Sequence, residues 1–240
     1  MKVQENDFNF LKKVVGLFEE VLVKEKDEGS NIIVADEHSG YIVNSTQKKS
    51  PFSKNGNFGL KNIKSFLKAV KDYGEIEETD MDLTFCTDKK KFTFKKLGQE
   101  TVAEITPRPI DTKGYITIGL TKEELDEMKE GLKNNISNYV SLIVEGKEFK
   151  FKIGGKISYE NIYEQKIKEL TRKETSTITF LTSLSYMNRF LNTLDEGSKV
   201  AILLKQGSPM IGLEANEFST TKTFIGEATE DEFSTQPSEE

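Results

Sequence analysis

Four lysines in residues 60–72 have a type and spacing that could bind an anion. They lie three, four and three positions apart: Lys61, Lys64, Lys68 and Lys71. On an α-helix this spacing stacks all four ammonium groups on one face. The opposite face, which would enter a core, carries Ile63, Phe66, Leu67 and Val70. Because like charges on one face repel each other, the pattern favours a polyanionic ligand such as a nucleic-acid backbone.

Groups that could catalyse a reaction are few. The single histidine, His38, lies in a predicted turn, and the single cysteine, Cys86, lies in a predicted strand. One residue of each kind argues against a catalytic dyad, a disulfide framework and a histidine- or cysteine-based metal site. Asp80 and Asp82 have no third ligand nearby, and residues 152–156 lack the spacing of a phosphate-binding loop. The sequence therefore favours a binding protein without cofactor or metal over an enzyme.

The composition limits the kind of nucleic-acid binder this chain could be. Its 240 residues are 35% hydrophobic and 31% charged, with a formal net charge of -6. A uniformly basic DNA-binding protein is excluded, so any DNA contact comes from a local basic surface. No apolar run approaches the roughly 20 residues that cross a bilayer, and the N-terminus lacks the apolar core of a signal peptide. We expect a protein of the cytoplasm, or of the host cytoplasm if it is viral.

The first half predicts helices, a hairpin and strands in a regular order. An amphipathic helix over 7–24, with Asp7 as its N-cap, comes first. A hairpin over 31–34 and 41–44 and the lysine-bearing helix over 60–72 follow. Three strands are then predicted at 81–86, 91–95 and 101–105. Two prolines and a glycine in 106–114 cannot sit inside a sheet. We therefore predict a domain at 1–106, a linker at 107–114 and a second domain at 115–240.

The second half repeats this order. A strand at 115–119 precedes a capping box, Thr121 to Glu124, which opens a helix to about Asn134 with Leu125, Met128 and Leu132 buried. Residues 161–171 read as a loop or an extended edge. The other predicted elements are a helix at 182–194 and strands at 148–153, 175–180, 199–205, 210–215 and 221–227. Each half thus reads as helix, hairpin, helix and three strands, which predicts an α+β fold with antiparallel sheets.

The repeat, the linker, the basic helices and the acidic C-terminal end together resemble the DNA sliding clamps. The nearest types are the PCNA-type clamps and the tailed-phage processivity factors. Residues 11–15, 60–70 and 186–191 look like the first, second and fourth inner helices of such a clamp. Residues 207–215 are similar to the clamp hairpin before the last strand. The acidic, aromatic ending 230–233 is like that of phage clamps, so we expect a bacteriophage protein.

The resemblance implies a fold, an assembly and an activity. Two similar clamp domains would place antiparallel sheets outside and two helices per domain around a hole. Subunits of this family close head to tail as a homotrimeric ring. Such a ring encircles double-stranded DNA, is opened by a clamp loader, and tethers DNA polymerase and other replication proteins without being an enzyme.

The same resemblance assigns binding residues. DNA contacts would go to phosphates without base readout. In the first half they come from Lys12, Lys13, Lys61, Lys64, Lys68 and Lys71, and in the second from Lys122, Lys129, Lys133 and Arg189. The second-half lysines are mixed with acidic residues, so the positive charge is weighted toward the first half. A pocket for a partner's peptide would be formed by Tyr41, Ile42, Val43, Pro109, Ile110, Pro209, Phe224 and Ile225.

Three alternatives stay open at this point. One is a monomeric or dimeric viral processivity factor with the same fold in an open arrangement. Another is an α+β enzyme whose site the sequence does not reveal. The third is a virion or scaffold protein that uses the basic face for assembly.

Overall fold

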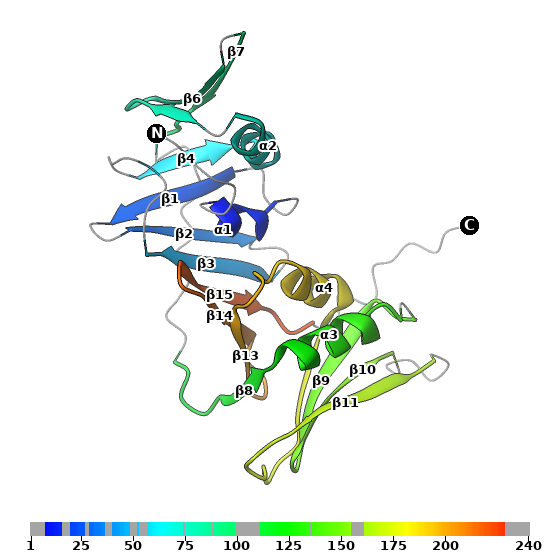
Figure 1. The fold of residues 1–240 in the computed structure, drawn as a ribbon. Helices are drawn as coiled ribbons and strands as arrows, with labels where there is room; N and C mark the ends of the chain where they lie inside the picture. The colour runs from blue at the N-terminus through cyan, green and yellow to red at the C-terminus, as the bar shows by residue number, and fades with distance from the viewer. Residues whose placement is uncertain are drawn as a thin grey trace. The chain divides into compact units, whose positions relative to one another are not determined.

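The computed structural model describes residues 8–15, 20–26, 29–36, 40–48, 52, 57–73, 75–87, 89–98, 111–134, 136–154 and 161–228. The chain divides into two compact units (Figure 1). Unit 1 comprises 1–111, 193–198 and 213–223, and unit 2 comprises 112–192, 199–212 and 224–240. The second half of the chain therefore contributes to both units. The domain boundaries at 106 and 115 stay a prediction.

Unit 1 contains an antiparallel sheet in the order β4-β1-β2-β3. Its strands are β1 (Glu20–Lys26), β2 (Gly29–Asp36), β3 (Tyr41–Gln47) and β4 (Phe58–Lys61). Strands β2 and β3 pair with Val34 opposite Val43, which confirms the predicted hairpin. Buried and more exposed side chains alternate along β3, as expected for a strand with one face on a core.

The predicted helix over 7–24 is wrong at 20–24, and its residues 16–19 lie outside the described part of the chain. Helix α1 spans only Asn9–Lys12, and β1 begins at Glu20. Near the start of the predicted helix, Phe8 and Leu11 lie three positions apart and are both buried. Farther on, Gly16 has low helix propensity, whereas the valines of β1 are β-branched and favour a strand. Pairing of β1 with both β2 and β4 then outweighs the apolar periodicity that suggested a helix.

Helix α2 (Ile63–Tyr73) packs on a small antiparallel sheet in unit 1. The strands are β5 (Ile76–Glu78), β6 (Asp82–Thr87) and β7 (Lys90–Lys95). Phe66 meets the rings of Phe85 and Phe94 edge to face, with centroids 5.5 and 5.3 Å away. Ala69 is buried, whereas Leu67, predicted to enter the core, is only partly buried. The strand predicted at 101–105 lies outside the described residues.

Unit 2 has a four-stranded antiparallel sheet in the order β11-β10-β9-β12. The strands are β9 (Tyr139–Glu145), β10 (Glu148–Ile153), β11 (Tyr163–Glu169) and β12 (Ile178–Ser183). The segment 161–171, for which a loop or an extended edge was expected, thus forms an edge strand. Strand β8 (Ile116–Leu120) pairs separately with β13 (Lys199–Leu204). Strands β14 (Met210–Ala215) and β15 (Ser219–Ile225) are each divided between the two units.

Two helices cover one face of the unit 2 sheet (Figure 1): α3 (Lys122–Gly131), which packs on β11, and α4 (Leu184–Asn192), which packs on β9 and β12. The predicted capping box opens α3. Thr121 Oγ1 accepts from the Glu124 amide at 3.2 Å, and Glu124 Oε2 accepts from the Thr121 amide at 2.8 Å. The helix ends at Gly131, where a Cβ would lie 2.3 Å from Phe151 Cζ.

The repeat is confirmed in order but differs in content from the expectation. In each half a helix is followed by four strands, and the fourth strand pairs with the first: β4 with β1, and β12 with β9. A second helix and further strands come next. The element between the two helices is therefore a four-stranded sheet, not a hairpin. The antiparallel α+β fold class is confirmed.

Candidate nucleic-acid interface

Helix α2 presents three of the four lysines that were predicted to share one helical face, whereas Lys61 lies on β4, before the helix begins at Ile63. Lys61, at the end of β4, and Lys64, Lys68 and Lys71 on the helix are all exposed. The other side of the helix is buried, with Ile63, Phe66 and Val70 at most 2% exposed. In the described part of the chain, no carboxylate lies within ion-pair distance of Lys64, Lys68 or Lys71. We refer to Lys64, Lys68 and Lys71 as the α2 basic face.

The α2 basic face carries a local energetic cost. Like charges three or four residues apart destabilise a helix by roughly 0.2–0.5 kcal/mol per pair. Burial of Phe66 among Phe8, Phe85 and Phe94 holds the helix in place against this repulsion. The charges are therefore positioned by the core and remain available to an external anion.

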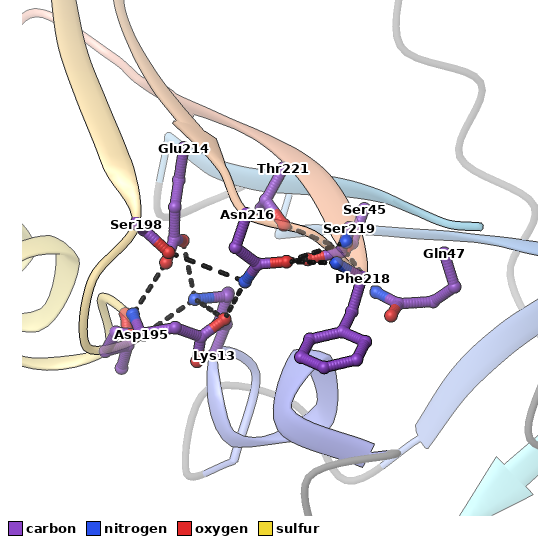
Figure 2. A network of polar contacts seen from close by, with 11 residues as sticks. Lys13, Ser45, Gln47, Asp195, Ser198, Glu214, Asn216, Phe218, Ser219 and Thr221 are labelled. Atoms are coloured by element: carbon purple, nitrogen blue, oxygen red, sulfur yellow. Dashed lines mark hydrogen bonds and ion pairs between the residues drawn. The ribbon is translucent and has the colours of Figure 1, made fainter. Parts of the chain in front are cut away.

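Lys12, the last residue of α1, and Lys13, just beyond the helix, have different surroundings. Lys12 is exposed, whereas Lys13 is 2% exposed. Lys13 Nζ donates to Glu214 Oε2 at 2.6 Å and to the Thr193 carbonyl at 2.7 Å, and lies 3.7 Å from Asp195 Oδ2 (Figure 2). The assignment of Lys13 to the DNA-facing set is therefore corrected. Exposing its ammonium group would leave the buried Glu214 carboxylate without its cation.

The network around Lys13 satisfies its other polar groups within unit 1. Glu214 Oε1 accepts from the Asp195 amide at 2.6 Å, and Asn216 Nδ2 donates to Asp195 Oδ2 at 3.0 Å (Figure 2). Asn216 Oδ1 accepts in turn from the amides of Phe218 and Ser219. This arrangement ties the first helix to segments from the end of the chain. Sequence reasoning missed it because Lys13 and Glu214 are 201 positions apart.

Helix α3 in unit 2 has the opposite charge character. Its ten residues include five acidic and two basic side chains. Lys122 is exposed and Lys129 is partly exposed. Lys133, just beyond the helix, pairs with Glu130, and both side chains are more than two-thirds exposed, so the pair adds little stability. Arg189 on α4 is partly exposed. Unit 2 therefore supplies less uncompensated positive charge than the α2 basic face.

Charges on the unit 2 sheet compensate each other. Hydrogen bonds from Lys150 to Glu164 and Glu145 raise the pKa of the lysine. The hydrogen bond and charge of Lys166 lower the pKa of Glu148, on the neighbouring strand. These cross-strand pairs place opposite charges side by side on β10 and β11.

The residues expected to form a partner-peptide pocket fall into three groups. Tyr41 and Val43 in unit 1, and Phe224 and Ile225 in unit 2, are buried and serve as core. Ile42 and Pro209 are partly exposed, and the Pro209 carbonyl accepts from the Tyr115 hydroxyl at 3.2 Å. Pro109 and Ile110 lie outside the described residues. The structure explains the buried members without a ligand, and the pocket stays a prediction.

The cysteine and the aspartate that could have taken part in chemistry have ordinary structural surroundings. Cys86 is partly buried, and Asp82 pairs with Lys95 at 2.8 Å. His38 lies outside the described residues. Among the residues that the structure describes, no cluster of histidine, cysteine or carboxylate side chains could hold a metal ion. Within the same part of the chain, no helix is long and apolar enough to span a membrane.

Comparisons with known proteins identify the fold. No protein-family model and no curated protein matches the chain. Among solved structures, PCNA of A. fulgidus, bound to the C-terminal region of FEN-1, is similar with a TM-score of 0.72 and 12% identity, over 94% of this chain and 96% of that one. PCNA of Thermococcus kodakaraensis is similar with a TM-score of 0.71 and 13% identity, over 95% of this chain and 98% of that one. A chain of the PCNA2–PCNA3 complex of Sulfolobus tokodaii is similar with a TM-score of 0.73 and 11% identity, over 94% of this chain and 97% of that one. The chain has the fold of a PCNA-type clamp.

Proposed function

We propose that this protein is a sliding clamp, a processivity factor that encircles duplex DNA and tethers DNA polymerase and other replication proteins. The observation that carries the proposal is the α2 basic face on a chain with the PCNA-type fold. A clamp fold needs a positive inner surface, and Lys64, Lys68 and Lys71 are exposed without a carboxylate partner in the described part of the chain.

Contacts of this kind suit sliding. Lys64 and Lys71 are seven residues apart on α2, which corresponds to about 10 Å along the helix axis. Ammonium groups at that spacing can contact phosphates, which carry no sequence information. Many weak and equivalent contacts leave no deep energy minimum along the DNA. The protein would therefore hold duplex DNA loosely at every position.

The proposed assembly is a homotrimer that closes head to tail and is placed on DNA by a clamp loader. A heterologous interface closes into a ring when its rotation divides the full circle. Pairing of sheet edges between subunits would also protect strands that otherwise aggregate. The similar Sulfolobus tokodaii structure is a complex of two PCNA chains, which supports association between clamp chains. The proposed location is the cytoplasm, or the host cytoplasm if the protein is viral.

A primer-extension assay tests the function. The polymerase from the same source extends a primer on a long single-stranded circle, with and without the protein and the loader. We expect longer products per binding event with the wild-type chain and a loss of that gain with Lys64→Glu/Lys68→Glu. The charge-matched control Lys173→Glu/Lys199→Glu, which changes exposed lysines of unit 2, should behave as wild type. Equal product lengths with and without the protein would contradict the proposal.

Mass in solution separates the ring from an open processivity factor. A closed trimer predicts about three times the 27.2 kDa of one chain. A stable monomer that still lengthens products would assign the protein to the open viral type.

A further inference from the structure

The hairpin of β6 and β7 in unit 1 carries a second basic surface, separate from the α2 basic face. Lys89, Lys90 and Lys91 are consecutive and exposed at its turn. In the described part of the chain, none of the three has a carboxylate within ion-pair distance. Asp88 precedes them in the sequence, so residues 88–91 still carry a net charge of about +2, with Asp ionised and Lys protonated at neutral pH. We call Lys89, Lys90 and Lys91 the hairpin lysines.

The turn that holds these lysines is ordered by its own hydrogen bonds. Thr87 Oγ1 accepts from the amide of Lys90 at 3.1 Å and from that of Lys89 at 3.4 Å. Lys90 then pairs with Thr87, and Lys91 with Cys86, across the hairpin. Because neighbouring strand residues point to opposite faces, Lys90 and Lys91 present charge on both sides of the ribbon. The cations therefore surround the tip.

An exposed aromatic ring lies beside the hairpin lysines. Phe92 is 45% exposed, and its ring centroid lies 4.9 Å from that of Phe94. Phe94 is buried under Phe66 of α2, so Phe92 extends the aromatic core of unit 1 into solvent. Lys90 and Phe92, two residues apart on one strand, share a face of the sheet. An anchored ring with a lysine on the same face offers both a stacking surface and a phosphate contact.

We infer that the β6–β7 tip binds single-stranded nucleic acid, with Phe92 stacking on a base and the hairpin lysines contacting phosphates. Single-strand binding commonly combines positive charge along the backbone with aromatic rings that stack on bases. Duplex DNA keeps its bases stacked inside, so it offers no open base face to Phe92. An acidic peptide would satisfy the lysines, but it offers no series of flat bases on which the Phe92 ring could stack. The inference goes beyond the duplex contact proposed for α2.

Fluorescence anisotropy of the full chain with a labelled 30-nucleotide oligo(dT) tests this inference. We expect Phe92→Ala to weaken binding by about 5-fold or more, the loss expected for one stacked base. Phe92→Leu, which keeps an apolar side chain of similar size, should lose nearly as much. Lys89→Ser/Lys90→Ser/Lys91→Ser should lower the slope of log affinity against log salt by about 2, from about 0.7 for each lost phosphate contact. Circular dichroism of each variant verifies the fold.

Two controls separate this surface from the α2 basic face. Lys64→Glu/Lys68→Glu should leave oligo(dT) affinity within 2-fold of wild type while weakening duplex binding. Lys89→Ser/Lys90→Ser/Lys91→Ser should weaken oligo(dT) binding and leave duplex affinity within 2-fold of wild type. Loss of duplex binding without loss of oligo(dT) binding supports the inference in Lys64→Glu/Lys68→Glu and would overturn it in Lys89→Ser/Lys90→Ser/Lys91→Ser. Unchanged oligo(dT) affinity in Phe92→Leu, or equal affinity of the wild type for polyglutamate of the same charge, would overturn the inference.

Discussion

The helices of the two units share an architecture but differ in surface charge. In both units a helix precedes four antiparallel strands whose fourth member pairs with the first, and a second helix follows. Helix α2 in unit 1 exposes lysines that lack carboxylate partners in the described residues. Helix α3 in unit 2 exposes mainly carboxylates. The buried residues thus preserve the repeated fold, while the exposed residues of each copy diverge.

Charge pairing sharpens this difference. In unit 2, Lys133 pairs with Glu130, Lys150 with Glu164, and Lys166 with Glu148. Those lysines are compensated where they stand and have less to gain from a phosphate. The comparison places most of the proposed DNA affinity in unit 1, and the following changes test it in order of expected effect.

The largest effect is expected inside unit 1, at the ion pair that removes Lys13 from the basic surface. Glu214→Ala removes the carboxylate 2.6 Å from the buried Lys13 ammonium group, which keeps the Thr193 carbonyl and a more distant carboxylate, Asp195, at 3.7 Å. Breaking such a pair costs about 3 kcal/mol or more in the free energy of unfolding. Urea denaturation measures this, with Glu217→Ala, at an exposed position, as the matched control. A decrease in unfolding free energy below about 1 kcal/mol is typical of an exposed ion pair, and it would put Lys13 back among the predicted DNA-facing lysines.

The next effect concerns the α2 basic face itself. Lys64→Glu/Lys68→Glu should weaken duplex binding roughly 30-fold at 0.15 M salt, because each lost phosphate contact removes the release of about one counterion. The slope of log affinity against log salt should fall by about 2 for the same reason. Anisotropy titrations between about 0.05 and 0.2 M salt measure both the duplex affinity and its salt slope, because such affinities change strongly over this range.

The charge-matched variant Lys173→Glu/Lys199→Glu changes two exposed lysines of unit 2 and is expected to stay within about 3-fold of wild type, since distant exposed charges are largely screened. If both variants lose affinity equally, net charge rather than the α2 basic face determines binding.

A smaller effect is expected when the charge of α3 is reversed. Asp126→Lys/Glu127→Lys replaces two exposed carboxylates, and we expect duplex affinity to rise on the order of 5-fold as repulsion is removed and phosphate contacts are added. The same anisotropy titration measures the change. Unaltered affinity would mean that α3 does not face the DNA, and the contrast between the units would then have no bearing on binding.

The smallest effect concerns how the two helices are held. Helix α2 depends on aromatic burial, whereas α3 begins at a capping box. Thr121→Ala removes the acceptor for the Glu124 amide and should cost about 1 kcal/mol of unfolding free energy. Thr175→Ala, at an exposed site outside helices and strands, is the control. A cost indistinguishable from that control would show that packing alone holds α3.

Local patterns predicted much of the fold. The lysine spacing of α2, the capping box at Thr121 and the hairpin containing Val34 and Val43 all depend on residues close in sequence, and all three are confirmed. The helix expected over 7–24 was wrong because pairing of β1 with two other strands overrides the apolar periodicity there. Such pairing is a tertiary effect that no short window contains.

The candidate site was predictable only where exposure follows from helix periodicity. The α2 lysines needed no distant partner to be placed on a surface. Lys13 looked equivalent to Lys12 in the sequence, yet its burial depends on Glu214 and Thr193 from the other end of the chain. Likewise, Tyr41 and Ile225 were expected in a pocket but are buried in the core. The sequence of an apolar segment does not distinguish a core position from a position in a binding site.

The most direct test of the central claim is retention on DNA before and after linearisation. The protein is assembled by its loader on a circular duplex with one single-stranded gap, separated from unbound protein, and the circle is then cut once. Encirclement predicts that the protein stays on the intact circle at salt that abolishes simple phosphate binding and leaves the DNA when it is cut. Equal retention on circular and linear DNA would contradict the account.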